Sequence, residues 1–201
     1  MNFVHLSFGG LLMKRFFTLL TIVFVMLMVV ALFAQKADKA TFQYVGAKKC
    51  KMCHNKAKTG KQFSLWQERG HAKAYETLAS KESKEIAAEM GIKGSPQEAK
   101  ECLVCHVTGY DAPADQKTVT LTMEEGVSCE ACHGPGSAYK KMKIMKDLHS
   151  GAAKAIDHGL IEPTAEVCVK CHNKKSPTYK EFVYEKAVKL INHPVANLTE
   201  K

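Results

Sequence analysis

Four copies of the pattern Cys-x-x-Cys-His account for all eight cysteines of this 201-residue chain. The copies occupy Cys50–His54, Cys102–His106, Cys129–His133 and Cys168–His172. Two thiols at this spacing can form thioether bonds to the two vinyl groups of one haem, and the adjacent histidine can then bind the iron. The sequence therefore predicts four haem c groups. The predicted attachment residues are Cys50, Cys53, Cys102, Cys105, Cys129, Cys132, Cys168 and Cys171, and the predicted proximal iron ligands are His54, His106, His133 and His172.

Paired cysteines have two other common uses. Eight cysteines in an exported chain could form four disulfides, and two tetrahedral zinc sites would use all eight thiols. Neither use requires a histidine directly after each pair. Because the histidine follows all four pairs, haem attachment is favoured over both alternatives.

The N-terminal segment predicts export. Lys14 and Arg15 precede a long apolar run that ends in small residues, a pattern typical of a secretory signal peptide spanning residues 1–34. Met13 could be the true start of translation. The rival interpretation is an uncleaved membrane anchor, because the apolar run is long enough to span a bilayer. Under either interpretation, residues 35–201 are expected to form one tetrahaem cytochrome c domain that is periplasmic or secreted.

The charge balance bears on partners. The chain has a formal net charge of +9, and after the N-terminal segment Arg69 is the only arginine. Lysines near haem edges could offset the propionates and steer an acidic redox partner. We therefore expect redox proteins with an acidic docking surface as partners. Nucleic acid is not expected, and a membrane is expected only through an uncleaved N-terminal anchor.

Hydrophobic periodicity predicts a mainly α chain with much irregular structure. The expected helices cover residues 62–80, 82–90, 137–148, 152–158 and 178–192. Ser95 is expected to start a helix leading into the second motif, and Thr164 to cap the helix that carries the fourth. Residues 118–122 could form a short strand. The protein core is expected to be thin, so that porphyrin supplies much of the buried apolar surface.

Four further histidines are candidates for distal iron ligands. They are His71, His149, His158 and His193. His71 is favoured because it follows Trp66 on a predicted helix and precedes a small residue, which lets a flat ring approach. His193 is the next candidate, because it follows the last apolar helix and is held by Pro194.

The remaining distal ligands stay open at this point. His149 and His158 lie near glycines on short predicted segments, and Met142 and Met145 share the helix of His149. A methionine thioether is also a haem ligand and raises the reduction potential. If neither histidine binds, at least one haem could be five-coordinate.

Segments around the motifs carry a family resemblance. They are Tyr44-Val45-Gly46, WQERGHA at Trp66–Ala72, CLVCHVTG at Cys102–Gly109, GVSCEACHGPGSAY at Gly126–Tyr139, and Pro163–His172. In these segments the chain resembles the cytochrome c-554 family of tetrahaem proteins, over about residues 44–194. The resemblance implies a compact, mostly helical multihaem cytochrome c, built around haems stacked in close pairs and acting as an electron carrier.

The resemblance also bears on the iron ligands. It implies that His71 is a distal ligand to a haem other than the first, and that one haem lacks a strong sixth ligand. Some relatives have a histidine near position 139, where this chain has Tyr139. His149 could take over that role.

The expected function is that of a periplasmic or extracellular electron-transfer protein, since closely packed haems permit short electron hops. One alternative is a haem enzyme that reduces nitric oxide or nitrite at a five-coordinate haem. Another is a subunit of a conductive cytochrome filament, with a distal histidine supplied by a neighbouring protomer. The sequence predicts no catalytic residue, because no nucleophile–base pair or phosphate loop stands out.

Overall fold

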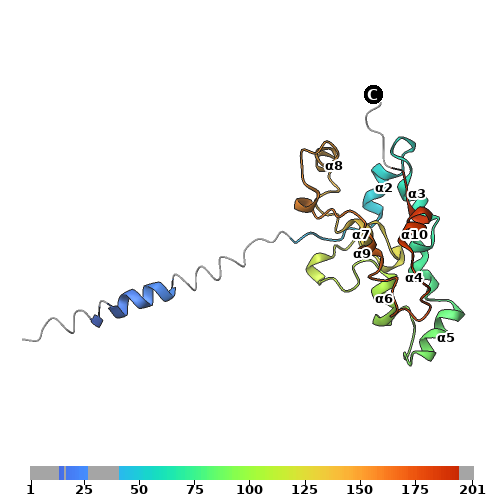
Figure 1. Cartoon of the computed structure of the whole chain (residues 1–201), viewed down its shortest axis with the longest axis horizontal. Coiled ribbons are helices and arrows are strands. Elements are labelled where there is room, and N and C mark those ends of the chain that lie inside the picture. Colours follow the sequence, from blue (N-terminus) through green and yellow to red (C-terminus); the bar gives the residue numbers. More distant parts are fainter. Residues whose placement is uncertain (1–13, 16, 27–40, 195–201) are drawn as a thin grey trace, which may run out of the picture. The chain divides into compact units, whose positions relative to one another are not determined.

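The structure of the chain is a computed structural model that describes residues 14–15, 17–26 and 41–194 (Figure 1). The chain divides into two units, residues 1–41 and residues 42–201, which are considered separately.

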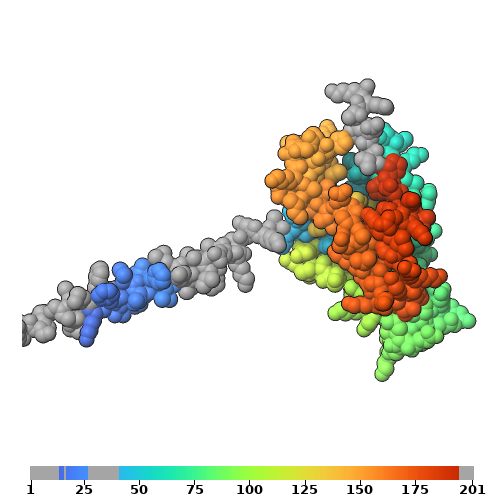
Figure 2. Space-filling view, in the orientation of Figure 1, coloured from blue at the N-terminus to red at the C-terminus, as the bar shows by residue number. Residues whose placement is uncertain are grey.

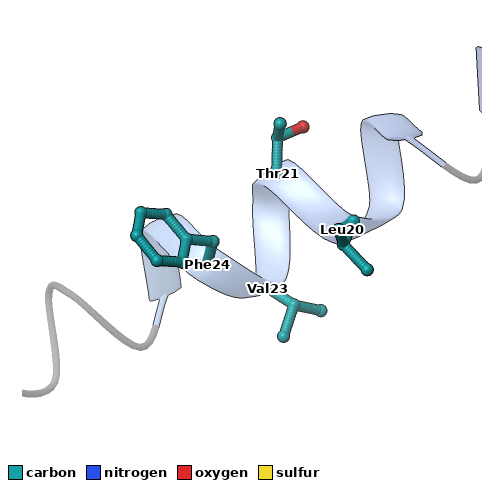
Figure 3. Close-up of a pocket in the computed structure, with 4 residues that line it drawn as sticks. All are labelled: Leu20, Thr21, Val23 and Phe24. Atoms are coloured by element: carbon teal, nitrogen blue, oxygen red, sulfur yellow. The ribbon is translucent and has the colours of Figure 1, made fainter.

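In the N-terminal unit, residues 14–15 and 17–26 are helical and their side chains are exposed. Leu20, Thr21, Val23 and Phe24 line a hollow along this helix, and Figure 3 shows their side chains. All four residues come from one stretch of helix, so the hollow is a feature of its surface. No helix in the described part of the chain is long and apolar enough to cross a membrane. Met13 and the predicted cleavage point after residue 34 lie outside the described residues.

The C-terminal unit is built from short helices joined by irregular chain (Figure 1). The α-helices are α2 (Lys48–His54), α3 (Gln62–Gln67), α4 (Ala74–Thr77), α5 (Lys81–Glu89), α6 (Lys100–His106), α7 (Cys129–His133), α8 (Met142–His149), α9 (Ala165–Cys168) and α10 (Tyr184–Ile191). The 3-10 helices are η1 (Ala57–Thr59), η2 (Gly70–Lys73), η3 (Ala114–Gln116), η4 (Met123–Glu125) and η5 (Ala155–His158). The prediction of a mainly α chain with much irregular structure is confirmed.

Two of the predicted helices match the structure only in part. The stretch expected at 62–80 is broken into α3, η2 and α4. The break falls where Arg69 adopts an extended backbone before Gly70, which has low helix propensity. The helix expected from Ser95 begins instead at Lys100, because residues 95–98 close a turn in which the Glu98 N–H donates to the Ser95 carbonyl at 2.9 Å.

Of the remaining helix predictions, one matches in length and three are shortened. The predicted helix at 82–90 is confirmed as α5, with Ser80 accepting a capping bond from the Ser83 N–H. The stretches expected at 137–148 and 152–158 become α8 and η5, and the last helix, α10, is shorter than 178–192.

The other local predictions are wrong in detail. Thr164 precedes α9 but makes no side-chain cap, because its hydroxyl bonds to Glu166 instead. The possible strand at 118–122 is absent from the described residues. Nearby there is a single isolated bridge between Tyr44 and Lys117. A strand needs a longer paired partner than this bridge provides.

The protein core is thin. Within residues 41–194 the buried hydrophobic residues are Val45, Ala47, Phe63, Leu78, Ala87, Leu103, Val107 and Tyr139. Leu78, Leu103 and Val107 form one cluster that joins α6 to the chain after α4. Because so few side chains are buried, the polypeptide alone removes little apolar surface from water, as the sequence analysis expects.

Gly126 allows the chain before α7 to pass close to η2. Its φ of +62° lies in the region that favours glycine, and a Cβ there would come within 2.7 Å of the His71 carbonyl oxygen. The next N–H, of Val127, donates to that carbonyl at 2.9 Å. The Trp66 indole N–H donates to the Val127 carbonyl at 2.9 Å. These contacts hold the η2 turn, and with it His71, against the segment that leads into the third motif.

Candidate haem site

Each of the four motifs lies on or at the end of a short helix. Three of them coincide with helix ends: α2 ends at His54, α6 at His106 and α7 at His133. The fourth begins in α9 and continues as a turn through His172. Residues three and four positions apart share one face of a helix, so both thiols and the histidine of a motif lie on the same side. This is the arrangement that attachment to one haem requires.

All eight cysteines are half-buried, and none of them is joined to another by a disulfide. Among the described residues, no cluster of three or more histidine, cysteine, aspartate or glutamate side chains is arranged to hold a bare metal ion.

Thiols from different motifs lie side by side. Interaction between the neighbouring Cys50 and Cys129 thiols is the main cause of a raised pKa at Cys50 and a lowered pKa at Cys129. Burial followed by the charge of Cys105 raises the pKa of Cys171 to about 12. Burial is the main cause that raises the pKa of Cys132, and the charge of Cys168 adds to the rise. The first motif is thus adjacent to the third, the third to the fourth, and the fourth to the second.

Two distal candidates face proximal candidates. The ring centroids of His71 and His172 are 6.0 Å apart, and those of His133 and His193 are 5.9 Å apart. Two imidazoles bound to opposite sides of one iron, each at about 2.0 Å, have their ring centroids about 6.2 Å apart. The residues present therefore fit an iron between the rings of each pair.

Burial also suits these histidines to metal binding. Burial is the largest cause that lowers the pKa values of His54, His71 and His133. A lowered pKa keeps the imidazole neutral, with a lone pair available for iron. At His193, Nδ1 is buried without a hydrogen-bond partner, which is costly unless another group occupies the site.

His106 is oriented by a backbone group. Its Nδ1 lies 2.7 Å from the Ala74 carbonyl oxygen at the start of α4. A carbonyl can only accept, so the proton must be on Nδ1, and Nε2 is left with the lone pair. This is the usual second contact of a metal-binding histidine.

The structure does not place the other predicted distal ligands beside a proximal histidine. His149 is exposed at the end of α8, and His158 is half-buried at the end of η5. In the described part of the chain, neither ring makes an aromatic contact. Met142 is exposed and Met145 is half-buried. Tyr139 is buried and donates its hydroxyl to the Gly134 carbonyl at 2.6 Å, and burial raises its pKa.

Sequence reasoning missed three residues at the site. Phe182 stacks on His172, with ring centroids 4.9 Å apart and an interplanar angle of 16°. Glu125 and Glu130 are buried carboxylates beside the first and third motifs. A weak signal for Glu130 was present, because an acidic residue interrupts the small and apolar residues of the third motif.

Comparison with known proteins finds a family that the central part of the chain resembles. Residues 49–134, which contain the first three motifs, match the family described as "Cytochrome c554 and c-prime". Over this region, the chain is similar to the cytochrome c-554 family. A curated cytochrome c-554 from Nitrosomonas europaea is 36% identical over 101 residues, which cover 48% of this chain and 40% of that protein. The chain thus matches less than half the length of this relative. No solved structure matches the chain.

The resemblance inferred from the sequence motifs is therefore confirmed. Similarity to the cytochrome c-554 family over residues 49–134 supports the expectation of c-type haem with iron in this part of the chain. The fourth motif, Cys168–His172, lies beyond the region that matches the family.

Proposed function

We propose that this chain is an exported electron-transfer protein with four haem c groups, one on each motif. The observation that carries the proposal is the pair of histidine–histidine separations of 6.0 and 5.9 Å at the fourth and third motifs. In a carrier, two strong axial ligands keep the iron saturated, so that it exchanges electrons without binding substrate. His71 would be the distal ligand at the fourth motif, and His193 at the third. The haem supplies the electron exchange, and the polypeptide sets its position and potential.

The contacts between motifs support a continuous route for electrons. The order of proximity is first, third, fourth, second, as judged from the thiols that influence one another's pKa values: Cys50 with Cys129, Cys132 with Cys168, and Cys105 with Cys171. Haems attached at neighbouring thiols are close to each other, and short separations favour rapid transfer. The route would therefore begin and end at the first and second motifs.

Mass spectrometry combined with electron paramagnetic resonance tests this function. Four attached haems should add about 2.5 kDa to the polypeptide. The oxidised protein should show low-spin signals from at least the third and fourth irons. An unmodified mass, or bound zinc, would contradict the proposal.

The same measurements separate the alternatives. A high-spin iron that binds nitric oxide and turns over nitric oxide or nitrite would favour the enzyme. A low-spin signal that appears only on association of several chains would favour a filament. The in-chain partner of His193, at 5.9 Å, supports a protein that completes the third site by itself.

Export and the nature of the partner are parts of the same proposal. The basic start at Lys14 and Arg15, followed by an apolar run, supports export to the periplasm or beyond. Lysines of residues 137–160 support an acidic partner. Residues 137–160, called the excursion below, contain α8 and form a lobe of their own (Figures 1 and 2). The excursion returns to the third motif, where the Ile161 N–H donates to the His133 carbonyl at 3.0 Å.

The exposed lysines on the excursion are Lys140, Lys141, Lys143, Lys146 and Lys154. Changing Lys140, Lys141 and Lys143 to glutamate should slow reduction of hexacyanoferrate(III) by the reduced protein, on the order of 3- to 10-fold at low ionic strength. The difference should vanish near 1 M salt, where charges are screened within about 3 Å. Stopped-flow kinetics measure both rates.

The matched control changes Lys81, Lys84 and Lys93, which are exposed on or near α5, to glutamate. This variant has the same net charge as the first. If the two variants slow the reaction equally, only net charge matters and the excursion is not the docking surface.

A further inference from the structure

Glu130 is a fully buried carboxylate inside the third motif. It lies on α7 between Cys129 and Cys132, and it is 1% exposed. Its Oε1 accepts the N–H of Val45 at 2.9 Å and of Gly136 at 2.6 Å. Its Oε2 accepts the N–H of Gly46 at 2.7 Å and again that of Val45 at 3.0 Å. Both carboxylate oxygens are therefore bonded to the backbone.

These bonds suit the ionised form of Glu130. All three partners are N–H donors. A protonated carboxyl would turn its own O–H towards these donors and would lose a hydrogen bond. Hydrogen bonds from N–H groups to a carboxylate are the stronger, charge-assisted kind. Burial raises the pKa of Glu130, and the bonds from Val45, Gly136 and Gly46 oppose that rise. The geometry thus places a negative charge in the protein interior.

The charge lies where the first and third motifs meet. Glu125, which is 7% exposed, accepts the Ala47 N–H at 2.7 Å, so the two carboxylates together hold the chain that enters α2. Glu130 is the neighbour of Cys129 in the third motif, and its partners Val45 and Gly46 precede α2, which carries the first motif. Gly46 permits this packing, because a Cβ there would lie 2.5 Å from the Thr120 carbonyl oxygen and 3.0 Å from Glu125 Oε1.

The second and fourth motifs have no equivalent in the described part of the chain. Glu125 and Glu130 are the buried carboxylates of this part of the chain. The acidic residues near the second and fourth motifs include Glu101, next to Cys102, and Asp111. Both are exposed, so water and salt screen their charges. A buried charge acts through a lower dielectric and is screened much less. Buried negative charge therefore lies beside the first and third motifs and not beside the second and fourth.

We propose that Glu130, assisted by Glu125, lowers the reduction potentials of the haems on the first and third motifs relative to those on the second and fourth. A nearby buried negative charge stabilises ferric over ferrous iron, which lowers the potential. Electrons then flow from the first and third motifs towards the fourth and second, one electron at a time, with no bond formed or broken. Glu130 acts on the haems through its charge and is a positioning residue for α2. The inference rests on the proposed function.

The test is Glu130→Gln in the holoprotein, with midpoint potentials measured by spectroelectrochemical titration. The change removes the charge and keeps the volume. Two of the four midpoint potentials should shift upward and two should stay in place. Unchanged potentials in a fully haem-loaded variant, or an equal shift of all four, would overturn the inference and leave the carrier function intact. Absence of haem from the wild-type protein would instead overturn the proposed function.

Three further variants separate charge from position. Glu130→Asp keeps the charge but is too short to reach all the backbone partners of Glu130. Because the charge is kept, the midpoint potentials of this variant should stay near those of the wild type. If Glu130→Asp shifts the potentials as Glu130→Gln does, the role is structural and the inference fails. Glu125→Gln should shift the same two potentials in the same direction. It replaces Glu130→Gln as the test if Glu130→Gln does not fold. Glu101→Gln, at an exposed carboxylate, should leave all four unchanged.

Discussion

Replacing His71 by alanine should convert one iron per chain from low spin to high spin. The His71 ring centroid lies 6.0 Å from that of His172, a separation that fits two imidazoles on one iron. Alanine removes the distal nitrogen, and water or an empty position replaces a strong ligand. Electron paramagnetic resonance of the oxidised protein should show the new high-spin signal. The reduced variant should bind about one equivalent of carbon monoxide more than the wild type does.

His149→Ala is the matched control, because His149 is an exposed histidine on α8. It should leave the spin count unchanged. His193→Ala should produce a high-spin iron at the third motif in the same way, since His193 lies 5.9 Å from His133. A His71→Ala protein that retains every low-spin signal would show that His71 is not an axial ligand.

Producing residues 41–201 without attached haem should give an unfolded chain. The described part of this segment buries only eight hydrophobic residues, and their burial cannot offset the conformational entropy lost on folding. Haem attachment would supply the missing apolar surface and covalent links, as metal binding does in other small domains. Circular dichroism should show little helix, and heating should give no cooperative transition.

The haem-loaded protein of the same length is the reference for this comparison. It should melt cooperatively and resist proteolysis under conditions that digest the apoprotein within minutes. If the apoprotein melts cooperatively with the same helix content, its own packing stabilises the fold and haem is not needed for folding.

Short-range patterns anticipated the local chemistry well. Each Cys-x-x-Cys-His motif spans five consecutive residues, and the structure places its thiols and histidine on or beside one helical turn. The helix expected at 82–90 appears as α5 because its cap at Ser80 and its end near Gly91 are local signals. The helix expected at 62–80 is broken where Arg69 adopts an extended backbone. The His71 carbonyl accepts the Val127 N–H from a distant segment as well as the Ala74 N–H of its own turn.

The amino-acid sequence alone indicated the residue types that can attach haem, the mainly α class and the resemblance to the cytochrome c-554 family. Which distal histidine faces which proximal one was not readable, because His71 and His172 are brought together by the path of the whole chain. The same holds for Glu130, whose partners Val45 and Gly46 are 85 and 84 positions away. Local periodicity reports only neighbours within a few turns. Contacts across such separations depend on packing, so only the folded chain shows where the buried charge and the paired rings lie.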